Sequence, residues 1–379
     1  MNKFILPVLL LLAASCKEKF VSPAPPVTTG YLVVEGVVNN DGGLTTLKLS
    51  RTTNLDDTSS KPEGGALVKL EDNNSTSLQL FETTNGNYIV DNLHLDTSHK
   101  YRLAIVTANN EEYLSDFVNV LNNPPIDSIN WVRGSDGVTI FINTHDPKNN
   151  THYYQWDYHE TWEFHSALFS SLKYTQNSSS GNMGIAYRDS SDPEIYTCWQ
   201  FHPSTTIVLG SSARLSQDII HLPIINIEPA SWKLSVLYSV IMRQYTWNKE
   251  GYEFLERMKK NTESVGSVFD AQPSELNGNI HCVSNPYQPV IGFFNICTIR
   301  EERIFIKNSE LPQWGYNMNC SQVVIENQPD SIRIKSVGTL PTVPLLYGPF
   351  GDILTFNASA EGCVDCTLRG SNIKPTYWP

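Results

Sequence analysis

The sequence predicts a mainly β fold with an N-terminal β-sandwich and a second β-rich domain that carries one main helix. Short β-prone runs recur from residue 31 onward and are separated by turn residues such as glycine, asparagine and aspartate. Convincing helical periodicity occurs in one segment, residues 249–263. With 379 residues, the chain is long enough for two or three domains that each bury a core.

The N-terminus has the order of a secretory signal. A lysine precedes an apolar run over residues 4–12, which is too short to cross a bilayer as a mature helix. Residues 12–16 (LAASC) resemble the lipobox at which bacterial lipoproteins are acylated and cleaved. We therefore expect a signal peptide over 1–15 and an acylated tether over 16–30, with Cys16 as the lipid attachment site. Ordinary secretion with an incidental Cys16 is the alternative.

Residues 31–121 contain seven short β-prone runs, as expected for a β-sandwich. Three stretches, 65–74 (GALVKLEDNN), 83–93 (TTNGNYIVDNL) and 100–106 (KYRLAIV), resemble the transthyretin-like regulatory domain. This resemblance implies a transthyretin-like or immunoglobulin-like scaffold without catalytic groups. The runs are Tyr31–Val38, Thr46–Ser50, Ala66–Glu71, Leu78–Thr83, Tyr88–Val90, Tyr101–Thr107 and Tyr113–Val118.

Pro124-Pro125 marks a boundary, because consecutive prolines interrupt regular structure. We assign 124–379 to a second, fibronectin-like β-rich domain with a large insertion. Its first strands are expected at Ser128–Arg133, Val138–Asn143 and Tyr153–Phe164. On the last of these strands, three aromatic residues share one face. They fill the core or form a ligand-stacking surface, and they are Tyr154, Trp156 and Tyr158.

The rest of this domain combines irregular and regular segments. Residues 165–230 are rich in serine, asparagine and aspartate, so we expect a loop insertion there. The helix over 249–263 is expected to be capped by Asn248. We expect residues 280–282 and 290–297 to form a hairpin. The terminus 374–379 (KPTYWP) is expected to pack rather than fray, because its tryptophan and tyrosine can bury large apolar area.

Six cysteines remain if Cys16 carries lipid, and an even number in an exported chain predicts disulfides. The terminal CxxC pair lacks the second ligand pair that a zinc site needs. It also lies in a predicted loop rather than at the helix start that a redox site needs. One arrangement joins the second and third of these cysteines across a hairpin and leaves the first and fourth for the terminal pair. The candidates are Cys198, Cys282, Cys297, Cys320, Cys363 and Cys366.

Composition and motifs argue against several functions. The net charge is −12 and no basic stripe occurs, so nucleic acid is not an expected partner. The sequence contains no GxSxG elbow, no HExxH pair and no phosphate-binding glycine loop. We therefore expect a protein that is not an enzyme and needs no cofactor. A hydrolase with an unrecognised site in 165–230 is the remaining catalytic alternative.

Five segments carry a wider resemblance: 16–20, 238–280, 285–294, 302–306 and 363–379. With them, the chain resembles the Bacteroidetes outer-membrane lipoproteins classed as domain of unknown function 4249, which are typically encoded beside TonB-dependent receptors. The resemblance implies an outer-membrane lipoprotein, facing the cell surface, that serves such a receptor as an accessory ligand-binding or lid subunit. Its partners would be the bilayer, through acylated Cys16, and the receptor. A surface adhesin or structural envelope protein is the alternative.

Overall fold

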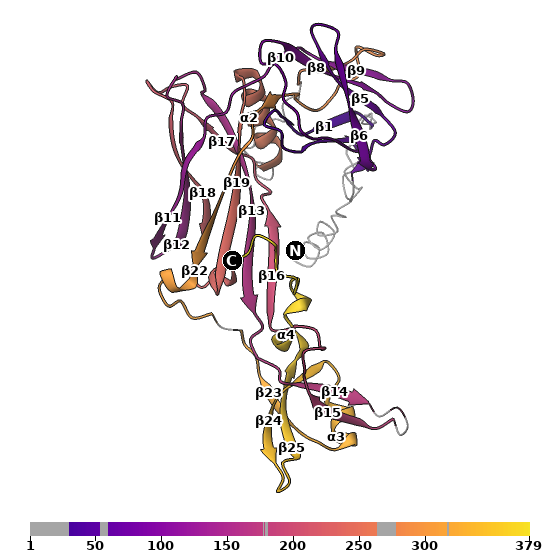
Figure 1. Ribbon diagram of the computed structural model, residues 1–379, viewed down its shortest axis with the longest axis vertical. Helices are drawn as coiled ribbons and strands as arrows, with labels where there is room; N and C mark the ends of the chain where they lie inside the picture. The colour runs from indigo at the N-terminus through magenta and orange to yellow at the C-terminus, as the bar shows by residue number, and fades with distance from the viewer. Residues whose placement is uncertain (1–29, 54–59, 177, 179–180, 264–277, 317) are drawn as a thin grey trace, which may run out of the picture.

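Three β-rich units follow one another along the long axis of the molecule (Figure 1). The computed structural model describes residues 30–53, 60–176, 178, 181–263, 278–316 and 318–379. The expected signal peptide, Cys16 and nearly all of the expected tether lie outside these residues. The described residues form 25 strands and three α-helices, so the fold is mainly β as predicted. No helix among them is long and apolar enough to cross a membrane.

The N-terminal unit, at the top of Figure 1, is built on a ten-stranded sheet. Nine strands of this sheet come from the first part of the chain and one comes from a much later segment, while β2 (Val38–Asn39) lies outside the sheet. Each of the seven predicted runs overlaps at least one of its strands. Tight turns join them, including Asn85-Gly86 between β6 and β7, where Gly86 has a φ of +81°. The strands from the first part of the chain are β1 (Leu32–Glu35), β2 (Val38–Asn39), β3 (Thr45–Arg51), β4 (Lys61–Pro62), β5 (Leu67–Asp72), β6 (Ser77–Thr84), β7 (Asn87–Val90), β8 (Lys100–Val106), β9 (Glu112–Ser115) and β10 (Val118–Asn119).

A much later segment completes this unit. Strand β20 (Ile280–Cys282) pairs antiparallel with β9, and β21 (Ile296–Cys297) pairs parallel with β2. Phe294 and Ile296 are buried in the same core as β1 and β3. The expected hairpin between these two strands is therefore wrong, because each uses its backbone groups to extend the N-terminal unit. The N-terminal unit therefore does not consist of residues 31–121 alone, because residues 280–297 also belong to it.

The central unit consists of two sheets that share one core. One sheet has the order β11-β12-β18, and the other has the order β16-β13-β19-β22, with β17 also paired to β13. The expected loop insertion over 165–230 is wrong, because five strands lie inside it and three of them pair with β12 or β13. The strands of the central unit are β11 (Ile126–Gly134), β12 (Gly137–His145), β13 (Tyr153–His165), β16 (Thr197–Pro203), β17 (Val208–Ser211), β18 (Ile219–Ile227), β19 (Leu237–Thr246) and β22 (Arg300–Lys307).

The other two strands of that segment belong to the distal unit, at the bottom of Figure 1. They pair as a hairpin and pack on a three-stranded sheet around the buried side chains of Leu172, Ile325 and Phe356. The sequence did not predict a separate unit here. Its elements are β14 (Leu172–Gln176), β15 (Met183–Tyr187), β23 (Gln322–Glu326), α3 (Pro329–Lys335), β24 (Thr339–Tyr347), β25 (Ile353–Ala360) and α4 (Glu361–Val364).

Helix α2 (Lys249–Glu263) has the predicted bounds and lies between the N-terminal and central units (Figure 1). The backbone N–H of Gly251 donates to Oδ1 of Asn248 at 2.8 Å, which satisfies one of the free donors at the helix start. Tyr252 and Leu255 are buried. Three 3-10 turns complete the regular structure: η1 (Trp232–Leu234), η2 (Asn308–Glu310) and η3 (Cys366–Leu368).

The C-terminus packs against the central unit, as predicted. Trp378 is buried, and its Nε1 donates to Oε2 of Glu163 at 2.8 Å. Its ring meets Phe305 edge to face, with ring centroids 5.6 Å apart. The guanidinium of Arg303 lies 3.7 Å from the centroid of the Tyr377 ring. These contacts fix the last residues on β13 and β22.

Candidate functional site

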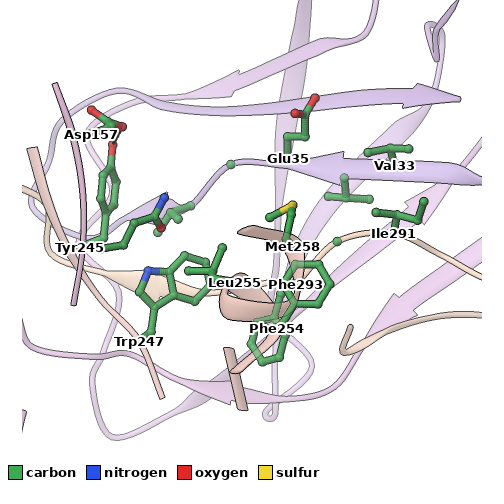
Figure 2. Close-up of a pocket in the computed structure, with 15 residues that line it drawn as sticks. Val33, Glu35, Asp157, Tyr245, Trp247, Phe254, Leu255, Met258, Ile291 and Phe293 are labelled. Carbon is green, nitrogen blue, oxygen red and sulfur yellow. Dashed lines mark hydrogen bonds between the residues drawn. The ribbon is translucent and has the colours of Figure 1, made fainter. Parts of the chain in front are cut away.

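A cleft of about 260 Å³ lies where the N-terminal unit, helix α2 and the central sheet meet (Figure 2). Its lining is mostly apolar and comes from four separate parts of the chain, namely 33–37, 155–157, 245–258 and 291–293. The apolar lining residues labelled in Figure 2 are Val33, Phe254, Leu255, Met258, Ile291 and Phe293. Clefts of this kind, mainly apolar with a few polar groups and placed between units, are the usual sites of small ligands.

Two glycines bring the walls of the cleft together. Gly36 has a φ of +125°, and a Cβ there would lie 2.4 Å from the backbone oxygen of Thr46. Gly292 has a φ of +148°, and a Cβ there would lie 2.5 Å from the backbone oxygen of Val34. A side chain at either position would both strain the backbone and clash. Gly292 therefore lets residues 291–293 run close beside β1, and Gly36 lets the chain after β1 pass close to β3.

Asp157 forms the polar end of the cleft, and its carboxylate is already engaged. Nε of Arg243 donates to Oδ1 of Asp157 at 2.7 Å, and the hydroxyl of Tyr245 donates to Oδ2 at 2.7 Å. Burial, reinforced by the charge of Asp157, raises the pKa of the Tyr245 phenol well above its ordinary value. Both oxygens of the carboxylate are thus bonded to neighbouring side chains, so Asp157 is not available as a catalytic base or nucleophile.

Two polar atoms in the cleft wall lack hydrogen-bond partners. They are Nε1 of Trp247, a donor, and Oε1 of Gln155, an acceptor, and both are covered by protein atoms. Only 6% of Trp247 is exposed. A buried polar group without a partner costs about 1–3 kcal/mol. A ligand that offers an acceptor and a donor could relieve this cost after a small movement of these side chains.

The sequence analysis did not identify Trp247 or Gln155. Their role depends on burial and on missing partners, which the pattern of residues does not show. The available signal was position: Trp247 stands directly before the cap of α2, within the 238–280 segment that carried the family resemblance.

The predicted ligand-stacking surface is wrong for two of its three residues. Tyr154 and Trp156 are fully buried in the central core, where their rings stack with centroids 5.6 Å apart. Nε1 of Trp156 donates to Oε1 of Gln244 at 2.9 Å, and the Tyr154 hydroxyl donates to Asp218. Tyr158 is half-buried and packs against the same core. The three rings therefore serve packing.

Two disulfides secure the C-terminal part of the chain: one joins η3 to β16 of the central unit, and the other joins α4 to the segment just before β23. The long-loop disulfide links Cys198 to Cys366 across 168 residues, and the short-loop disulfide links Cys320 to Cys363 across 43 residues. The cysteines of the CxxC pair thus bond to two different partners rather than to each other or to a metal. Among the residues that the structure describes, no group of three histidine, cysteine, aspartate or glutamate side chains could hold a metal ion.

The pairing of Cys282 with Cys297 is wrong, because both are free thiols in the structure. Cys282 lies on β20 and Cys297 on β21, and these strands extend different parts of the N-terminal unit. Both thiols are buried, and burial raises the pKa of the Cys297 thiol to about 12. A thiol in this state is a small apolar side chain rather than a nucleophile.

Comparison with known proteins places the chain in a family. The family described as domain of unknown function (DUF4249) matches residues 17–303. A comparison with curated proteins found no match. The matched region includes all of the strands and the helix that line the cleft, and it ends within β22. Since it spans well over half of the chain, this protein belongs to the DUF4249 family.

Proposed function

We propose that this protein is a non-catalytic lipoprotein of the bacterial outer membrane that serves a TonB-dependent receptor as an accessory ligand-binding or lid subunit. In this proposal, acylated Cys16 holds the protein to the bilayer at the cell surface, and the organism belongs to the Bacteroidetes. The transthyretin-like and fibronectin-like sandwich scaffolds expected from the sequence would act as supports for the cleft.

The cleft between the units is the observation that supports ligand binding. It combines an apolar lining with an unpartnered donor and an unpartnered acceptor, whereas its two carboxylates are paired, Asp157 with Arg243 and Tyr245 and the exposed Glu35 with Lys48. This is the composition of a binding site. Because interfaces between units within a chain commonly permit relative motion, binding in this cleft could be coupled to a change in the arrangement of the units.

A pull-down from outer membrane solubilised in mild detergent tests the partnership. We expect the tagged protein to bring a TonB-dependent barrel with it, identified by mass spectrometry. Recovery of the protein alone would count against the receptor role. A Cys16→Ser variant should fold normally, since the tether lies before the first strand, but it should be released from the membrane fraction by repeated washing, because no acyl chains then anchor it stably.

A matched pair of variants on α2 tests the cleft. Met258→Glu places a charge in the apolar lining, whereas Glu256→Lys changes a charge on the exposed side of the same helix. We expect Met258→Glu to impair growth on the nutrient that the co-purified receptor imports, and Glu256→Lys to leave growth unchanged. Equal growth of both variants and the wild type would contradict a role for the cleft.

The arrangement of the three units end to end is the observation that favours the alternative, a surface adhesin or spacer (Figure 1). A deletion strain discriminates between the two functions. Loss of attachment with normal uptake would support the adhesin, and loss of uptake with normal attachment would support the receptor subunit.

A further inference from the structure

The hairpin of β24 and β25 in the distal unit is almost free of charge. Residues 336–360 contain a single charged side chain, Asp352, although 17% of the whole chain is charged and roughly four charges would be expected in 25 residues. Buried strands commonly lack charge, but much of this hairpin is not buried. It lies beyond the region that matches the family, at the end of the molecule farthest from the N-terminal unit (Figure 1).

The end of this hairpin exposes large apolar side chains. Phe350, in the turn, is 95% exposed, and Leu346 and Tyr347 at the end of β24 are 54% and 51% exposed. Register places Leu346 opposite Thr355 and Tyr347 opposite Ile353, so these side chains lie at one tip. We define the hairpin tip as residues 343–354. Its exposed apolar side chains are Val343, Leu345, Leu346, Tyr347, Phe350 and Leu354.

Part of the backbone in the turn of the hairpin tip is paired internally. The N–H of Gly348 donates to the carbonyl of Asp352 at 2.8 Å, and the N–H of Gly351 donates to the carbonyl of Gly348 at 3.1 Å. Pro344 and Pro349 have no N–H to satisfy. Since an unsatisfied backbone group is costly in an apolar medium, these features lower the cost of placing the turn in the interfacial layer, where water still reaches the edge of β24.

The edge of the sheet argues against an added strand from a second copy or a peptide. β24 is an edge strand, and its pairing with β25 is irregular on both sides of Pro344 and again after Leu346. Prolines and irregularities of this kind are how natural sheets prevent edge-to-edge association. The exposed side chains are therefore available for contact, whereas the exposed backbone edge is poorly suited to pairing.

We propose that the hairpin tip inserts into the interfacial layer of a lipid bilayer. A surface that binds a specific protein partner usually has a polar rim and forms directional hydrogen bonds. The exposed apolar side chains of the tip offer few such groups, and the hydroxyl of Tyr347 already lies 3.1 Å from that of Tyr187. A convex, apolar tip with aromatic residues matches the requirements of a membrane interface instead. The tip carries a single charge, Asp352, and its other side chains are uncharged, which limits the desolvation cost of contact with a lipid surface.

Vesicle sedimentation with the full mature chain carrying Cys16→Ser tests this inference, because no acyl group then contributes. We expect this protein to sediment with neutral phosphatidylcholine vesicles. Replacing Phe350 and Leu346 together by serine should lower the partition coefficient at least tenfold. The matched control is Phe81→Ser on the N-terminal unit, where Phe81 is 64% exposed, and it should bind like the parent chain. All variants should keep the parent melting temperature, since none of these side chains is buried.

Three results would overturn the inference: no sedimentation of the parent chain, equal sedimentation of the double variant, or binding that disappears in 0.5 M salt. The last result would show that charge holds the protein to the vesicles, whereas insertion of apolar side chains is insensitive to screening. If the double variant instead lost the co-purified receptor without any vesicle binding by the parent, the tip would be a protein-docking surface. Loss of vesicle binding with normal receptor co-purification would support the inference and leave the proposed function intact.

Discussion

Replacing Trp378 by alanine should destabilise the central unit, although this residue is next to last in the chain. The indole ring is 6% exposed, it meets Phe305 edge to face, and its Nε1 donates to the carboxylate of Glu163. The long-loop disulfide ends twelve residues before it, so the segment that carries the ring is already confined near its docking site. This confinement lowers the entropy cost of docking the tail.

The expected magnitude follows from these contacts. Truncation of a buried tryptophan to alanine costs about 3–5 kcal/mol in protein cores. We expect about 3 kcal/mol here, because a chain end can relax around the gap. For a unit of about 150–250 residues, each kcal/mol lowers the melting temperature by about 2–4 °C, so a decrease of about 6–12 °C is expected. Trp378→Phe keeps the ring contact but loses the hydrogen bond to Glu163, and should cost about half as much.

Differential scanning calorimetry of the wild type and the two Trp378 variants measures this effect. Tyr287→Ala is the matched control, since Tyr287 is 94% exposed and its loss should change the melting temperature by less than about 1 °C. If Trp378→Ala melted within about 1 °C of the wild type, the tail would not stabilise the central unit and the reasoning would be refuted.

Three further predictions concern the cysteines and the tryptophans. Replacing both cysteines of a disulfide by serine should lower the free energy of unfolding by about 5 kcal/mol for the long-loop disulfide and about 4 kcal/mol for the short-loop disulfide, because the larger loop costs more entropy to close. Urea titration measures both losses, and a larger loss for the short-loop disulfide would contradict this account. Cys282 and Cys297 should react with a thiol reagent only after unfolding, and rapid labelling of the native protein at pH 8 would contradict their burial. Trp156→Phe should destabilise the protein by about 1–3 kcal/mol more than Trp247→Phe, since only the indole of Trp156 has a hydrogen-bond partner, and equal losses would show that Trp247 is also paired.

Local signals in the sequence predicted local structure well. The strands of the first 121 residues and helix α2 follow from alternation, turn residues and the Asn248 cap, all of which operate within a few residues. Alternation also placed Tyr154 and Trp156 on one face of β13. It could not show which side of the sheet that face would cover, since this depends on β12 and β18, which pack across it.

The failures share a physical cause, which is pairing between distant residues. β16 and β17 were not recognised, because most of their residues are exposed or half-buried and they depend on β13 for their backbone partners. The cleft is lined by β1, α2 and residues 291–293, among other segments, and contacts between segments so far apart leave no short pattern in the sequence. In contrast, the scarcity of charge in residues 336–360 was visible in the sequence. It indicates an apolar surface only because the structure shows that many of these side chains are exposed.

The late arrival of β20 and β21 has a consequence for how the chain is made. A polypeptide synthesised and threaded from its N-terminus delivers residues 31–121 long before Ile280, with roughly 160 residues between them. During that interval the edge of β9 has no neighbour, and an open edge is a template for pairing with another nascent chain. A chaperone that covers this edge until residue 297 has been made is therefore expected to improve folding, and a fragment that stops at residue 121 should aggregate.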